Sequence, residues 1–122
     1  MRHSKSIRLR VMRDDVIAFG PGKAALLLAI SQHGSISAAA RALAMSYRRA
    51  WLLVEEMNAS FREPLVATAT GGANGGGAHI TALAQAMLMR YAHMSAKAEA
   101  AIAPDMAYFE SLMVITGEAD PD

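Results

Sequence analysis

Four consecutive residues, Ser46, Tyr47, Arg48 and Arg49, carry side chains that can hydrogen-bond to a nucleic acid. A guanidinium group can donate two parallel hydrogen bonds to a guanine, and a tyrosine or serine hydroxyl can reach a phosphate or a base edge. Serine also caps helix N-termini, so we expect a helix that begins after Ser46 and runs to about Ser60. Its apolar face would consist of Ala50, Leu53, Val54, Met57 and Phe61. Arg48 and Arg49 lie off this face and are expected to project from the first turn.

Two exposed arginines alone are more often simply solvated, so their role depends on the elements around them. A helix is predicted from Lys23 to His33, where Gly34 can end it. Its buried side would contain Leu26, Leu27, Ile30 and the alanines around them. The first of the two helices that follow is short and rich in alanine, because Ser35-Ile36-Ser37 can restart a helix that spans about Ala38 to Leu43.

Three helices in this order form a tri-helical unit. In a helix-turn-helix, the second helix of the pair enters the major groove with its N-terminal residues toward the base edges, while the preceding helix crosses the DNA backbone. The order of the helices therefore favours a DNA-reading role for Tyr47 and Arg48.

Two hairpins are predicted around the helices. Ile7, Leu9 and Val11 alternate with Arg8 and Arg10, as in a strand with one buried face, and Val16 to Ala18 can return as a second strand. After Pro64, residues 65–70 and 78–80 flank the run GGANGGG, which favours a hairpin with a glycine-rich tip. This second hairpin, residues 65–80, is the expected wing. The fold class is thus mainly α with small β-hairpins, a winged helix-turn-helix.

A long last helix is predicted from the cap residue Thr81 to about Ala103. Pro104 should interrupt it, and Asp105 to Ile115 would form a further short helix. The chain divides into a DNA-binding domain, residues 1–81, and a helical dimerisation extension, residues 82–122. The predicted dimer interface is an apolar row at spacings of three and four that contains Leu83, Met87, Tyr91, Met94, Ala98 and Ile102.

The predicted DNA contacts come from the recognition helix, from helix starts and from the wing. Lys23 and Arg41 are placed to reach phosphates, with simple solvation about equally expected. Trp51 can either pack against Tyr47 and the helix edge or contact DNA, and packing is favoured. The glycine-rich tip lets backbone N–H groups approach a phosphate, although a tip without contacts is the alternative. The full set is Ser46, Tyr47, Arg48, Arg49, Arg41, Lys23, Ser35, Ser37, Thr68, Thr70, Gly72, Asn74 and Gly75.

Composition narrows the protein class. The 122 residues suit one domain, 53% are hydrophobic, and cysteine is absent, which excludes disulfides and thiolate zinc sites. The sequence contains neither an apolar run long enough for a membrane span nor a secretory signal, so we expect a cytoplasmic protein. All 12 basic residues lie at or before Lys97 with only five acids, a side-chain balance of +7, and the six remaining acids follow. The basic part suits a polyanionic partner, although solvated surfaces would look the same.

An enzyme is not expected. The four histidines are scattered, no serine lies in a nucleophile elbow, and Glu55 and Glu56 are adjacent on an exposed helix face. The glycine-rich loop lacks both the lysine of a Walker A motif and a βαβ unit, so a nucleotide-binding enzyme is remote. No metal or cofactor is predicted.

The segment GSISAAARALAMSYRRAWLLVEEMN, followed by REPLVATATGGANGGGAHIT, closely resembles the N-terminal domain of ModE-type molybdate-responsive transcriptional regulators over about Gly20 to Tyr91. The pairing of SYRRAW with a glycine-rich wing distinguishes it from the broader LysR-type winged helices, to which it is also similar. The resemblance implies a homodimeric transcription factor that binds double-stranded DNA. It places Ser46, Tyr47 and Arg48 at the start of the recognition helix, Thr70 to Gly77 in the wing, and the dimerisation element after Thr81.

Full-length regulators of this type carry molybdate-binding domains after the DNA-binding domain, whereas this sequence ends at Asp122. The roughly 20 residues after Ala103 are too few for even a small β-barrel, and their acidic side chains would repel an oxyanion. Molybdate binding is therefore not expected in this chain. DNA binding would be either constitutive or controlled by a separate protein or signal.

The competing hypothesis is a winged-helix protein-interaction module in which the arginines meet acidic side chains of a partner, since a fold does not fix a function. Such a module would show negligible affinity for duplex DNA at low salt and would co-purify with a defined protein.

Overall fold

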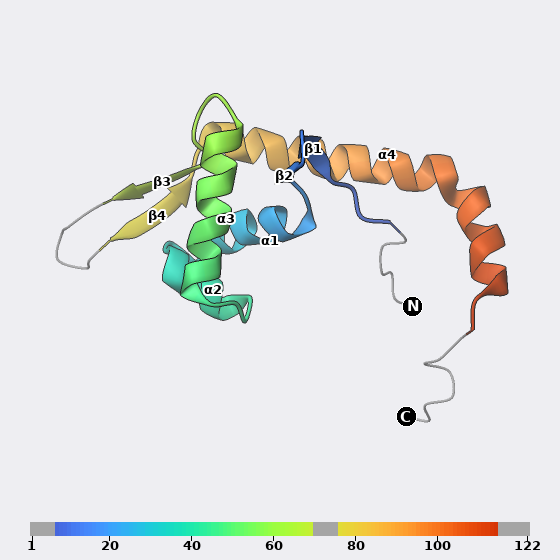
Figure 1. Ribbon diagram of the computed structural model, residues 1–122, viewed down its shortest axis with the longest axis horizontal. Helices are drawn as coiled ribbons and strands as arrows, with labels where there is room; N and C mark the ends of the chain where they lie inside the picture. The colour runs from blue at the N-terminus through green and yellow to red at the C-terminus, as the bar shows by residue number, and fades with distance from the viewer. Residues whose placement is uncertain (1–6, 70–75, 115–122) are drawn as a thin grey trace.

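The computed structural model describes residues 7–69 and 76–114. Three helices and a two-stranded wing form one unit, and a long helix extends from it (Figure 1). The predicted winged helix-turn-helix is confirmed.

The chain enters the fold through a small antiparallel hairpin of β1 (Val11–Arg13) and β2 (Val16–Phe19). The expectation that the first strand starts at Ile7 is wrong, because β2 ends at Phe19, and residues 7–10 have no strand beside them. Leu9 instead accepts a hydrogen bond through its carbonyl from the Tyr91 hydroxyl, 2.7 Å away. The segment before β1 is therefore held by the last helix rather than by a sheet.

The first helix, α1 (Pro21–His33), starts two residues earlier than expected, because proline is well suited to a first helical position. Its end is as predicted. Gly34 has a left-handed backbone, φ 79°, and its N–H donates to the Ile30 carbonyl at 2.8 Å.

The helix-turn-helix consists of α2 (Ile36–Ala42) and α3 (Tyr47–Ser60). The Ser35 hydroxyl accepts from the Ala38 N–H at 3.1 Å, so α2 begins at Ile36 rather than at Ala38. Between the helices, Ala44 adopts a left-handed backbone with φ 55°, which redirects the chain into α3.

The core lies where these three helices meet the base of the wing. The predicted side chains Leu26, Leu27 and Ile30 of α1 are fully buried, and so is Met57 of α3. Of the other residues expected on the apolar face of α3, Ala50 and Val54 are buried, and Leu53 and Phe61 are partly buried against the core. The face away from this core is free to present Arg48 and Arg49.

The wing consists of β3 (Val66–Ala69) and β4 (Gly77–Ile80), which pair antiparallel from Val66 with Ile80 to Ala69 with Gly77. Asn58 of α3 fixes its base. The Asn58 Oδ1 accepts from the backbone N–H groups of Leu65 at 2.8 Å and Val66 at 3.2 Å, and its Nδ2 donates to the Val66 carbonyl at 3.1 Å. The wing therefore has a fixed position relative to α3.

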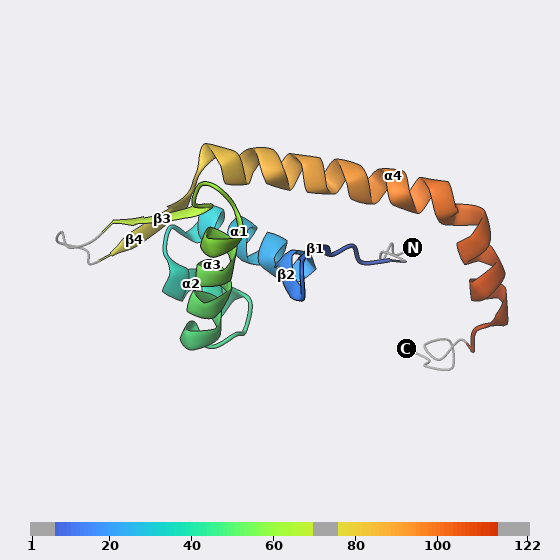
Figure 2. The same ribbon diagram turned by 45° about the horizontal axis from the view of Figure 1, so that its top comes forward.

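The last helix, α4 (Ala82–Leu112), starts at the predicted cap, where the Thr81 hydroxyl accepts from the Ala84 N–H at 3.2 Å. The expectation that Pro104 ends the helix is wrong, because Pro104 lies inside α4. Proline removes one helical hydrogen bond and favours a kink, and Figure 2 shows α4 turning in its C-terminal third. The distal part of α4 projects away from the winged unit (Figure 2).

None of the helices in the two described ranges is long and apolar enough to cross a membrane.

Candidate nucleic-acid interface

The first turn of α3 presents polar side chains to solvent. The Ser46 hydroxyl accepts from the Arg49 N–H at 3.0 Å, which caps the helix as predicted. Tyr47, Arg48 and Arg49 are all exposed, and the Tyr47 side chain is 55% accessible. Because the buried residues of α3 start at Ala50, this first turn contributes little to the core and can contact a ligand.

Trp51 packs against Tyr47 and the edge of the core, which was the favoured interpretation. Trp51 is half-buried against the core, and its ring meets Tyr47 edge-on, with centroids 6.2 Å apart and an interplanar angle of 81°. Trp51 therefore limits the positions that the Tyr47 phenol can take.

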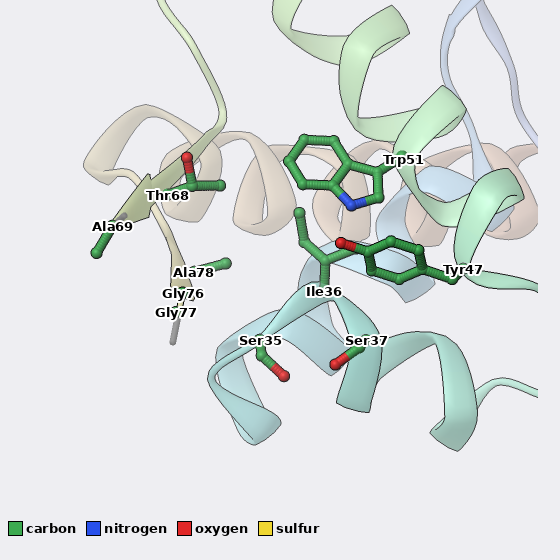
Figure 3. Close-up of a pocket in the computed structure, with 10 residues that line it drawn as sticks. All are labelled: Ser35, Ile36, Ser37, Tyr47, Trp51, Thr68, Ala69, Gly76, Gly77 and Ala78. Atoms are coloured by element: carbon green, nitrogen blue, oxygen red, sulfur yellow. The ribbon is translucent and has the colours of Figure 1, made fainter. Parts of the chain in front are cut away.

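A hollow of about 480 Å³ lies between the start of α2, the first turns of α3 and the wing (Figure 3). It brings together Ser35, Ser37, Tyr47 and Thr68 from the predicted set and adds Trp51. The remaining lining residues are small or apolar, namely Ile36, Ala69, Gly76, Gly77 and Ala78. None of these ten residues is charged, so the hollow offers hydroxyl groups and aromatic edges rather than ion pairs.

Gly76 permits the two strands of the wing to lie close together. A Cβ on Gly76 would lie 3.0 Å from the Ala69 carbonyl oxygen, whereas one on Gly77 would lie at an ordinary contact distance of 3.5 Å from the Gly34 carbonyl oxygen. That Gly34 oxygen accepts a hydrogen bond from the Ala78 N–H at 2.9 Å. The glycine run in the sequence was a signal for this close approach, although it did not identify Gly76 or Gly77 as lining residues.

Among the other predicted contacts, Arg41 is exposed in the last turn of α2. Four predicted wing-tip residues, Thr70, Gly72, Asn74 and Gly75, lie outside the described residues. Arg49 lies on a different side of α3 from the hollow and lines a second cleft with Arg10 and Glu56.

The structure does not support the prediction that Lys23 reaches a DNA phosphate. Its side chain is only 4% exposed, its Nζ lies 2.9 Å from a carboxylate oxygen of Glu56, and it donates to the Ile17 carbonyl. A buried ammonium that is already paired with a carboxylate is not available to a phosphate. Lys23 instead connects β2, α1 and α3, a role that its position at the start of a helix did not reveal.

The six residues of the predicted dimer interface fall into two groups that differ in what they pack against. Leu83, Met87 and Tyr91 are partly buried against the hydrophobic core of the chain itself. The ring centroids of Tyr91 and Phe19 lie 5.2 Å apart in an edge-to-face arrangement. Burial raises the pKa of the Tyr91 hydroxyl, and the positive charge of Arg10 partly opposes this increase. Farther along α4, Met94 is exposed and Ala98 and Ile102 are partly buried. The participation of all six in a dimer stays a prediction.

Within residues 7–69 and 76–114, no three histidine or carboxylate side chains lie close enough together to hold a metal ion.

Residues 23–85 match the bacterial regulatory helix-turn-helix proteins of the lysR family. The chain is 40% identical over 80 residues to the molybdenum-pterin-binding protein MopA of Rhodobacter capsulatus. This match covers 66% of this chain and 30% of MopA. It is 42% identical over 71 residues to the transcriptional regulator ModE of Yersinia pestis, and 41% identical over 71 residues to the DNA-binding transcriptional dual regulator ModE of Escherichia coli K12. Each of these two matches covers 58% of this chain and 27% of the relative. The chain therefore spans less than a third of the length of these relatives.

Proposed function

This chain belongs to the lysR family of bacterial regulatory helix-turn-helix proteins, and on that basis we propose that it binds double-stranded DNA as a homodimeric, sequence-reading transcriptional regulator of the ModE type. The observation that carries the proposal is the exposed first turn of α3, where Tyr47 lines the hollow beside the wing and the side chains of Arg48 and Arg49 are exposed to solvent.

In the proposed complex, α3 enters the major groove. Arg48 donates to a guanine edge, and Arg49 reaches either a base or a phosphate. The Tyr47 hydroxyl reaches a phosphate or a base. The contact with Trp51 limits the movement of the Tyr47 ring. A preorganised aromatic side chain loses less conformational freedom on binding than a mobile one.

The hollow between α3 and the wing would receive the sugar-phosphate strand that separates the two grooves. Its lining supports this, because Ser35, Ser37 and Thr68 supply hydroxyl groups, and Gly76 and Gly77 carry no side chain that would cover the backbone. Uncharged donors would fix the position of the strand, and Arg41 would add the long-range attraction to phosphate.

Homodimerisation is proposed through the part of α4 beyond Tyr91. A dimer would place two recognition helices at half-sites about one helical turn of DNA apart, which suits a pseudo-palindromic operator. Residues 1–81 would then be the DNA-binding domain and residues 82–122 the dimerisation extension.

Two of these relatives are named as ModE and one as a molybdenum-pterin-binding protein. We assign DNA binding to this chain, because the matched residues contain the helix-turn-helix, and we propose no molybdate binding for it. We likewise propose no enzymatic role.

Fluorescence anisotropy with a labelled duplex over a series of salt concentrations tests the proposal. We expect binding at low salt that weakens steeply as the salt concentration rises, because bound phosphates release counterions. Absence of duplex binding at low salt, together with co-purification of a defined protein, would favour a winged-helix interaction module instead.

A further inference from the structure

A second cleft, of about 450 Å³, lies on a side of α3 that does not face the wing hollow. The residues that line it come from the segment before β1, from the junction of β2 with α1, and from α3. The charged residues among them are Arg8, Arg10, Lys23, Arg49 and Glu56. The cleft shares no lining residue with the hollow beside the wing.

The cleft carries excess positive charge. Its lining includes three exposed guanidinium groups, those of Arg8, Arg10 and Arg49. The one carboxylate in the lining, Glu56, is already paired with Lys23 at 2.9 Å. Within the part of the chain that the structure describes, none of the three arginines forms an ion pair with a carboxylate. Like charges held in one cleft repel each other, and a bound anion would relieve that repulsion.

The start of α1 opens into the same cleft. Its N-cap residue is Gly20, so no side chain caps the helix, and no acidic residue lies in the first turn. The free N–H groups and the helix dipole there add to the attraction of the arginines for an anion. Arg10 covers this end, since a Cβ on Gly20 would lie 3.4 Å from the Arg10 Cγ, while the space beside Gly22 is open.

The size and the apolar lining restrict the ligand class. A cleft of about 450 Å³ is within the size range of small-molecule sites and is larger than one tetrahedral oxyanion would fill. Leu52 is 48% exposed beside the arginines, and Ile17 and Leu53 also line the cleft. We propose that this cleft binds a small organic molecule with two or more carboxylate or phosphate groups on an apolar frame.

Arg49 connects this site with DNA binding, and this step rests on the proposed function. Arg49 belongs both to the first turn of the recognition helix and to the cleft. An anion that pairs with Arg49 removes its charge from the DNA-facing surface, so the ligand lowers DNA affinity and DNA lowers ligand affinity by the same factor.

Isothermal titration calorimetry on the chain without DNA tests the site itself. The probes are citrate and 3-phosphoglycerate, with sulfate as a compact anion, all at constant ionic strength. We expect saturable binding of at least one organic probe, and at least about tenfold weaker binding of sulfate, because sulfate is small relative to a cleft of about 450 Å³ and has no apolar part to contact Leu52 and Leu53. Binding of sulfate as tight as that of citrate would overturn the ligand class.

A matched pair of variants locates the binding. Arg8→Ala/Arg10→Ala should raise the dissociation constant of the organic probe about tenfold, because it removes two charge-assisted contacts. Arg62→Ala/Arg90→Ala removes the same net charge from exposed positions outside the cleft and should change it less than about twofold. Equal losses in the two double variants, or no saturable binding in the parent chain, would overturn the site.

Duplex binding with and without the organic probe tests the coupling. Saturating probe should weaken duplex binding of the parent chain about fivefold and leave Arg8→Ala/Arg10→Ala unaffected. If that variant alone weakened duplex binding as much as Arg48→Ala, the cleft would be a DNA contact and the small-molecule proposal would fail. If the parent chain bound no DNA, the proposed function would fail, and the calorimetry would still decide the cleft.

Discussion

The ammonium group of Lys23 lies 2.9 Å from a carboxylate oxygen of Glu56, and this ion pair joins the first turn of α1 to α3. Lys23 is 4% exposed and Glu56 is 50% exposed, so the lysine depends on this partner far more than the carboxylate does. The pair fixes the position of the recognition helix relative to the rest of the fold.

Glu56→Gln should therefore destabilise the protein by about 1–3 kcal/mol, because it leaves a buried ammonium without a countercharge, while the exposure of Glu56 keeps the loss below that of a fully buried pair. Urea-induced unfolding measures the change. Glu55→Gln removes the same charge from the neighbouring exposed position and should cost no more than about 0.5 kcal/mol. Equal effects of the two variants would contradict the importance of the pair.

Asn58→Ala should cost about 2–4 kcal/mol, because two backbone N–H groups and one carbonyl at the base of the wing lose their partner. Asn58→Asp keeps the Oδ1 acceptor and loses the Nδ2 donor, so its loss should be smaller at neutral pH. Equilibrium unfolding ranks the two variants. A loss below about 0.5 kcal/mol for the alanine variant would show that Asn58 does not hold the wing.

We predict that the free energy of unfolding decreases at high pH because of the Tyr91 hydroxyl. Burial raises the pKa of its hydroxyl above the ordinary tyrosine value of 10.0, and the positive charge of Arg10 partly opposes this increase. The folded state therefore binds this proton more tightly than the unfolded state, so the contribution is complete below the unfolded pKa and is lost as pH rises through the folded pKa. In Tyr91→Phe, unfolding curves measured from pH 8 to 11 should lose this part of the pH dependence. Tyr108→Phe, at a 64% exposed position, should retain it.

Met94→Asp should halve the particle mass in sedimentation analysis at micromolar concentration, because a carboxylate in an apolar helix seam is costly to bury. Met89→Asp is the matched control on a different side of α4, where Met89 is already 75% exposed. A parent chain that is itself monomeric would contradict the proposed dimer, as would a Met94→Asp variant that remains dimeric.

Local signals in the sequence predicted the order of the elements. Ser46 and Thr81 are cap residues whose partners lie three residues away, and Gly34 ends α1 through its own backbone. The failures depend on distant partners. The pairing of Lys23 depends on Glu56, 33 positions later, and residues 7–10 form no strand because Pro21 begins a helix early. No local pattern shows that Asn58 would bind the backbone of β3.

In the candidate site, too, local sequence signals predict some features, and others depend on contacts between distant parts of the chain. The exposure of Arg48 and Arg49 follows from the apolar period of α3, which is a property of one helix. The hollow beside the wing and the basic cleft each combine side chains from three parts of the chain. Only the fold shows that Arg8, Arg10 and Arg49 share a cleft.

If α3 reads DNA sequence, the protein must prefer a selected duplex over a random one. This preference should be measured by fluorescence anisotropy for the parent chain, Arg48→Ala and Arg62→Ala. Loss of a bidentate base contact should reduce the preference of Arg48→Ala by about 1–3 kcal/mol, roughly 5- to 150-fold, and Arg62→Ala should keep it. An Arg48→Ala variant with unchanged preference, or a parent chain that binds no duplex at low salt, would show that α3 does not read DNA sequence through Arg48.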